Sequence, residues 1–120
     1  MKRSLVVKLN QGAEAPETVN QAFTVAATAL ASGVSVSLWL TGEAAWFAMP
    51  DGADDLKLTH ATPLGDLRAT VVAGGTLTVC TQCAVRRGIT EDAVLDGVRI
   101  AGSAAFVEEV LGDDVQALVY

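Results

Sequence analysis

The sequence predicts a three-layer α/β/α protein with a mainly parallel sheet of five strands, and two observations support this fold class. Short apolar strand patterns alternate along the chain with segments whose apolar residues recur at helical spacing, which is typical of a parallel sheet covered by helices on both faces. Hydrophobic residues make up 51% of the chain and aromatic residues only 5%, which suits buried strands under closely packed helices. A length of 120 residues indicates one domain over residues 1–120.

The first part of the chain is expected to form a strand, a long helix and a second strand. Residues 4–9 form an apolar run that predicts a buried strand. Pro16 suits the first position of the following helix, because the backbone N–H that it lacks would be unpaired there in any case. The apolar stripe of this helix consists of Val19, Phe23, Ala26 and Leu30. Gly33 ends the helix, and apolar alternation over residues 34–40 predicts the second strand.

The middle of the chain is expected to be mainly helical. The sequence predicts a short helix at residues 44–49, an acidic turn at residues 50–55 and a longer helix at residues 63–73. A pair of glycines ends the longer helix, and residues 76–79 form the third strand.

Helices and strands continue to alternate in the rest of the chain. The helix after the third strand ends at Gly88. Thr90 is expected to cap a short helix that Gly97 ends, with Glu91 and Asp92 placed favourably in its first turn. The last predicted elements are a strand at residues 98–101, a helix at residues 103–111 and a strand at residues 115–119.

The chain is acidic, with a formal net charge of −6 and an isoelectric point near 4.5. Its eight Lys and Arg residues are too few for a protein that must neutralise phosphates, so neither nucleic acid nor an anionic membrane surface is an expected partner. Residues 18–42 have no formal charge, but at Gly33 their period changes from helical spacing to alternation. That change favours a helix followed by a buried strand over a membrane span.

The start of the chain does not read as a secretory signal, because Lys8 interrupts the first apolar run. We therefore expect a cytoplasmic protein in a reducing compartment. A close pair of cysteines in that compartment is more often catalytic, redox-active or metal-binding than a structural disulfide.

The two cysteines, Cys80 and Cys83, lie where the third strand is expected to pass into a helix. Unpaired N–H groups at a helix start favour a thiolate, the nucleophilic form of cysteine, so this position indicates sulfur chemistry through a persulfide or a disulfide. No metal is predicted, because a zinc site would need ligands from another subunit in a chain whose one histidine is His60. The remaining alternative is that both thiols are buried apolar side chains.

Ligands of parallel sheets bind outside the carboxyl ends of the strands, where three loops of this chain are expected to meet. Cys80 and Cys83 are the candidate catalytic residues there. The candidate substrate-binding residues are Asn10, Gln11, Gly12, Thr41, Gly42, Thr81 and Gln82. Arg86 and Arg87 could hold an anionic sulfur species, although a place in the last helical turn explains them more simply. The sequence contains neither a phosphate loop nor a dinucleotide fingerprint, so no cofactor is expected.

The spacing between Cys80 and Gly88 is the most specific motif in the sequence. Val79-Cys80 precedes Arg86-Arg87-Gly88-Ile89, so that the cysteine stands eight positions before the glycine. Asn10-Gln11-Gly12 follows the first strand, and Gly42 follows the second. In these features, which extend over nearly the whole chain, the sequence resembles the DsrE/DsrF-like, or YchN-like, family. Persulfide-carrying members of that family have a single cysteine at the place of Cys80, and Cys83 is an additional thiol.

The resemblance implies a sulfur-relay function, in which a carrier or sulfurtransferase-like subunit receives a persulfide on Cys80 from a donor protein and passes its sulfur to an acceptor. Cys83 could release that sulfur by closing a disulfide. The resemblance also implies a homotrimer or homohexamer, which agrees with the high apolar content of a small acidic chain. Two other functions stay open, a thiol–disulfide redox protein and an oligomeric module that binds a small molecule without catalysis.

Overall fold

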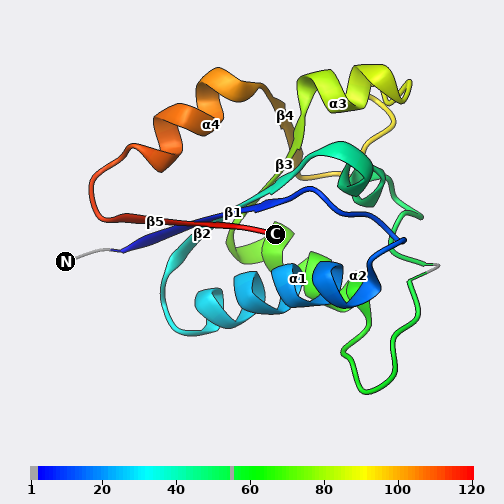
Figure 1. Ribbon diagram of the computed structural model, residues 1–120, viewed down its shortest axis with the longest axis horizontal. Coiled ribbons are helices and arrows are strands. Elements are labelled where there is room, and N and C mark those ends of the chain that lie inside the picture. Colours follow the sequence, from blue (N-terminus) through cyan, green and yellow to red (C-terminus); the bar gives the residue numbers. More distant parts are fainter. Residues whose placement is uncertain (1–2, 55) are drawn as a thin grey trace.

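The computed structural model describes residues 3–54 and 56–120, and its centre is a five-stranded sheet (Figure 1). All neighbouring strands are parallel, and their order across the sheet is β4-β3-β2-β1-β5. The strands are β1 (Ser4–Leu9), β2 (Ser35–Leu40), β3 (Thr76–Cys80), β4 (Val98–Ala101) and β5 (Val115–Val119). The predicted three-layer α/β/α class is confirmed, with a sheet that is parallel throughout.

The helices lie on both sides of this sheet. Figure 1 shows α1 (Pro16–Ala31) and α2 (Leu64–Gly74) on one side, with α3 (Thr81–Arg86) and α4 (Ser103–Val110) on the other. The last connection runs from the edge strand β4 through α4 to the opposite edge strand, β5. The uncharged stretch at 18–42 forms most of α1 together with β2, and no helix in the described part of the chain is long and apolar enough to cross a membrane.

The main core lies between the sheet and the layer formed by α1 and α2. Inward-facing strand residues lie in register across β1, β2 and β3, so that their side chains form continuous apolar rows. The fully buried members are Val7, Leu9, Leu38, Leu40, Leu77 and Val79. Phe23 of α1 packs edge-to-face against Phe47, with ring centroids 6.1 Å apart. Phe47 belongs to η1 (Gly42–Ala48), a 3-10 helix where the sequence predicted a short helix at 44–49.

The opposite face of the sheet is joined to α4 by a polar cluster. Glu109 of α4 accepts hydrogen bonds from the Ser37 hydroxyl at 2.6 Å and from the Trp39 indole N–H at 3.1 Å. Its other oxygen lies 2.6 Å from the Arg99 guanidinium. The Trp39 ring also packs edge-to-face on Phe106 of α4 at 5.3 Å, so Trp39 is buried although it points away from the main core.

The predicted short helix between Thr90 and Gly97 is wrong, because this segment forms turns. The Thr90 hydroxyl donates to the Asp92 carboxylate at 2.7 Å instead of capping a helix, and the Leu95 N–H donates to the Ala48 carbonyl at 2.8 Å. Helix nucleation is unfavourable in so short a segment, and here the backbone is used for a tertiary contact. The predicted acidic turn is observed at residues 50–54, while Asp55 lies outside the described residues.

Candidate functional site

Both cysteines lie at the carboxyl end of β3, as the sequence predicted. Cys80 is the last residue of the strand and the N-cap of α3, and Cys83 lies one turn further along that helix. Both are free thiols, and they are nearly equally covered, with exposed fractions of 8% for Cys80 and 9% for Cys83. Solvent access alone therefore does not show which of the two thiols is the nucleophile.

The pKa of the Cys80 thiol lies below its ordinary value. Burial is the largest single effect and raises that pKa, but several interactions that favour the thiolate together outweigh it. The backbone N–H and the thiol of Cys83, the backbone N–H of Gln82 and the positive charge of Arg86 all lower the pKa of Cys80. Arg86 is exposed in the last turn of α3, and its effect on Cys80 is that of a charge acting through space.

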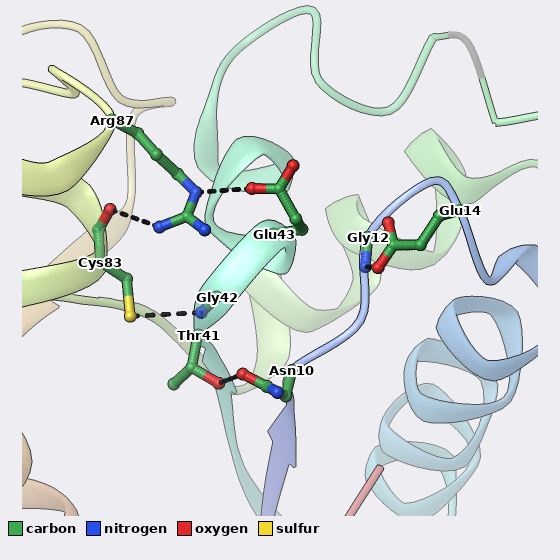
Figure 2. A network of polar contacts seen from close by, with 8 residues as sticks. All are labelled: Asn10, Gly12, Glu14, Thr41, Gly42, Glu43, Cys83 and Arg87. Carbon is green, nitrogen blue, oxygen red and sulfur yellow. Dashed lines mark hydrogen bonds and ion pairs between the residues drawn. The ribbon is translucent and has the colours of Figure 1, made fainter.

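Gly42 brings the second loop to the cysteines, and its backbone N–H donates a hydrogen bond to the Cys83 sulfur at 3.2 Å (Figure 2). Gly42 has a φ of +53°, in the left-handed region that favours glycine. A Cβ atom at this position would lie 2.6 Å from the Asn10 side-chain oxygen, so a larger residue would push the two loops apart.

The loop after β1 packs against the loop after β2. The Thr41 hydroxyl lies 3.1 Å from both the Leu9 carbonyl and the Asn10 side-chain oxygen, and it can donate its single proton to either (Figure 2). Gly12 is buried against Glu43. A Cβ atom added to Gly12 would lie 2.7 Å from the Cβ atom of Glu43, so the two residues are in close contact. The Gly12 N–H donates to the Glu14 carboxylate at 2.9 Å, which holds the loop in this shape.

Glu43 and Arg87 join η1 to the cysteine helix. The Arg87 side chain forms an ion pair with Glu43 at 2.8 Å and also donates to the Cys83 carbonyl at 3.1 Å (Figure 2). The structural interpretation of Arg87 is therefore correct, since the residue follows the last turn of α3 and binds one of its carbonyl groups. Sequence reasoning missed Glu43, because an acidic residue directly after Gly42 has no local pattern that predicts a partner 44 positions away.

The three predicted loops thus meet, but not every candidate residue makes a defined contact there. Asn10 lies against both Thr41 and Gly42, Gly12 packs against Glu43, and Gly42 is hydrogen-bonded to Cys83. Thr81 and Gln82 are exposed at the start of α3, and Gln11 is half-buried beside Gly12. His60 is exposed in the loop before α2, away from the two cysteines in the sequence. Among residues 3–54 and 56–120, no three His, Cys, Asp or Glu side chains lie together as a metal site requires.

Comparisons with known proteins agree with this fold. The structure is similar to the YchN protein from E. coli, with a TM-score of 0.81 and 18% identity over 98% of this chain and 99% of that one. A protein of unknown function from Methanobacterium thermoautotrophicum has a TM-score of 0.68 and 13% identity, over 99% of this chain and all of the other. A conserved protein of unknown function from Bacteroides thetaiotaomicron has a TM-score of 0.59 and 14% identity, over 98% of this chain and 95% of its own.

These structural matches are too distant in sequence to show more than the fold. A search of curated proteins finds no significant relative. The family model of the DsrE/DsrF-like family, however, matches residues 4–115, which include every strand start and both cysteines. The protein belongs to the DsrE/DsrF-like family.

Proposed function

We propose that this protein is a sulfur-relay protein that carries sulfane sulfur as a persulfide on Cys80. The observation that supports this most is the position of Cys80, at the carboxyl end of a central strand and beside a second thiol, in surroundings that lower its pKa. Family membership supports the same function, because sulfur relay is associated with DsrE/DsrF-like proteins in general. The reducing cytoplasm is the proposed location, since a reactive thiol pair persists there in its reduced form.

The loading step requires no cofactor. The Cys80 thiolate attacks the outer sulfur of a donor persulfide, a new S–S bond forms on Cys80, and the donor leaves as a thiolate. The bond that breaks and the bond that forms are of the same kind, so there is no net oxidation. The surroundings that stabilise the Cys80 thiolate also stabilise the negative charge on the persulfide.

Mass spectrometry of the intact protein tests this function. After brief treatment with polysulfide, we expect the reduced protein to gain the mass of one sulfur atom, and we expect Cys80→Ser to abolish that gain. Cys83→Ser should still gain sulfur and is the matched control. If Cys80→Ser were loaded and Cys83→Ser were not, the proposed carrier residue would be wrong.

A thiol–disulfide redox function is the second candidate, because Cys83 lies only three residues after Cys80, in the first turn of α3. Residues three apart at a helix start can close a disulfide after a small adjustment. In this case the protein would lose two hydrogens under oxidants that contain no sulfur, and it would transfer no sulfur to an acceptor thiol. A protein whose mass is unchanged by either treatment would instead fit the non-catalytic binding module.

We further propose that the protein assembles into homotrimers or homohexamers, and that other proteins donate sulfur to it and accept sulfur from it. Large apolar side chains that remain exposed occur on α4 and on the edge strand β5, which has no neighbour on its outer side in the described chain. These residues are Val107, Leu111, Leu118 and Val119. Exposed large apolar side chains on an unpaired edge strand and on the helix that packs beside it suit a subunit interface.

A further inference from the structure

The Gly42 N–H donates a hydrogen bond to the Cys83 sulfur, and the loading of sulfur on Cys80 does not require this contact. A sulfur atom is a weak acceptor when it is a neutral thiol and a strong one when it is charged. A fixed N–H beside Cys83 therefore acts most strongly on a state in which the Cys83 sulfur carries negative charge. Such a state arises if Cys83 attacks the sulfur of a loaded Cys80.

The Gly42 N–H is fixed from three directions. Its own left-handed backbone lies against Asn10, and the Thr41 hydroxyl ties the same turn to the loop after β1. On the other side, the ion pair of Glu43 with Arg87 joins η1 to α3, and Arg87 also binds the Cys83 carbonyl. Because both ends of the N–H···S contact are held, the donor needs little rearrangement when charge develops on the sulfur.

We propose that Cys83 is the resolving thiol of this protein and that the Gly42 N–H stabilises its sulfur during the release of hydrosulfide. This inference rests on the proposed persulfide on Cys80. Cys83 lies three residues after Cys80, in the first turn of α3, so the inner sulfur of the persulfide is the atom within its reach.

Hydrosulfide is released while a disulfide forms between Cys80 and Cys83. The Cys83 thiol gives its proton to the outer sulfur, and the Cys83 sulfur attacks the Cys80 sulfur. The bond between Cys80 and the outer sulfur breaks, and hydrosulfide leaves with the bonding electron pair. The sulfane sulfur is reduced by two electrons and the two cysteines are oxidised to a disulfide, which a dithiol reductant must reduce before the next cycle.

A single-turnover experiment tests this release. The protein is loaded with polysulfide, separated from excess reagent and incubated without thiols, while released sulfide and intact mass are followed. We expect wild type to release one sulfide per loaded chain and to finish two hydrogens lighter than the reduced protein. Loaded Cys83→Ser should keep its added sulfur.

Gly42→Ala tests the N–H donor. The added Cβ displaces the turn that carries this N–H, so release per loaded chain should slow by about ten-fold, the loss expected for one hydrogen bond to a developing charge. Gly33→Ala is the matched control, because Gly33 also has a positive φ, of +85°, yet an added Cβ there would meet nothing within 4 Å. Should Gly42→Ala fold poorly, Glu43→Gln weakens the same support without changing the backbone, and about three-fold slower release is expected.

The outcomes separate this inference from the proposed function. If neither wild type nor Cys83→Ser ever gains sulfur, the carrier function itself fails. If wild type loads but releases sulfide no faster than Cys83→Ser, or releases it without forming a disulfide, the carrier function stands and the resolving role of Cys83 is wrong. If Gly42→Ala and Gly33→Ala release sulfide at the same rate as wild type, the Gly42 N–H has no part in release.

Discussion

Opposing effects at one side chain determine the reactivity of Cys80. Burial raises the pKa of its thiol, and the neighbouring N–H groups, the Cys83 thiol and the Arg86 charge lower it by more. All of these favourable groups belong to α3, and the largest contribution among them comes from a backbone N–H, that of Cys83. Arg86 adds a contribution that salt should screen.

The first prediction concerns the acidity of Cys80. In a Cys83→Ser background, its alkylation rate should rise with pH through an apparent pKa below the ~8.5 of a free cysteine, because the thiolate is stabilised. Arg86→Gln should move that apparent pKa upward, and more clearly at low salt. Rates measured between neutral and alkaline pH decide this. A midpoint at or above that of a free cysteine would show a thiol governed by burial alone.

Individual elements in this fold are joined by polar side chains as well as by apolar packing. The helix α4 contains no fully buried residue, and Glu109 connects it to β2 and β4 through Ser37, Trp39 and Arg99. Burial raises the pKa of Glu109, but the hydrogen bonds from Ser37, Arg99 and Trp39 and the charge of Arg99 more than offset this, so its pKa lies below the ordinary value.

The second prediction is a pH-dependent loss of stability in Glu109→Gln. A carboxylate whose pKa is lower in the folded state stabilises the fold above its unfolded pKa of ~4.3, and this stabilisation is lost as pH falls through the lower folded pKa. Near neutral pH the variant should lose about 1–3 kcal/mol in the free energy of unfolding. The difference from wild type should shrink in acid. Denaturant unfolding across this range measures it, with the exposed neighbour Glu108→Gln as the control that should show little change.

The third prediction concerns Arg68, which sequence reasoning did not single out. Its buried guanidinium donates to the carbonyl groups of Phe47 at 2.8 Å, Met49 at 2.6 Å and Pro50 at 2.8 Å, where η1 ends. Arg68→Met keeps the apolar stem but leaves these carbonyls without their donor, so the free energy of unfolding should fall by about 3 kcal/mol. Arg68→Lys should lose less free energy of unfolding, because its ammonium group can still donate hydrogen bonds to some of these carbonyl groups. Equal losses in both variants would contradict this role of the guanidinium.

Large apolar side chains are exposed on one edge strand of the sheet and at the end of the adjoining helix. Val119 is 69% exposed and Leu111 is 77% exposed, on β5 and directly after α4. The edge strand β5 also contains no charged residue or proline that would oppose pairing with another chain.

The fourth prediction is that this surface forms a subunit interface. Sedimentation should show wild type as a trimer or a hexamer, and Val119→Asp should shift it toward smaller species, because a charge would be buried at the contact. Val85→Asp is the matched control, since Val85 is 71% exposed on α3, away from β5, and its substitution should leave the assembly unchanged. A wild-type monomer would contradict both the composition argument and this choice of surface.

Local periodicity was sufficient to predict most of the fold. The strands at Ser4–Leu9, Val98–Ala101 and Val115–Val119 begin and end at the predicted residues, because alternating or continuous apolar runs bounded by glycine or polar residues have few other stable conformations. The same reasoning placed Cys80 at the junction of β3 and α3. It failed for residues 90–97, where capping residues were present but the segment was too short for a helix without tertiary support.

The contacts between distant segments could not be predicted from the sequence, because they exist only in the folded chain. Gly42 and Cys83 are 41 positions apart, and Glu109 and Ser37 are 72 apart, so no local period links them. Each pair meets because the parallel sheet brings strand ends together and because α4 crosses from one edge of the sheet to the other. The sequence therefore predicted which residues could be reactive, through their place on strands and helices. The donor that faces Cys83, the Glu43–Arg87 ion pair and the attachment of α4 were decided by packing between distant segments, since hydrogen bonds of this kind form only once those segments are in contact.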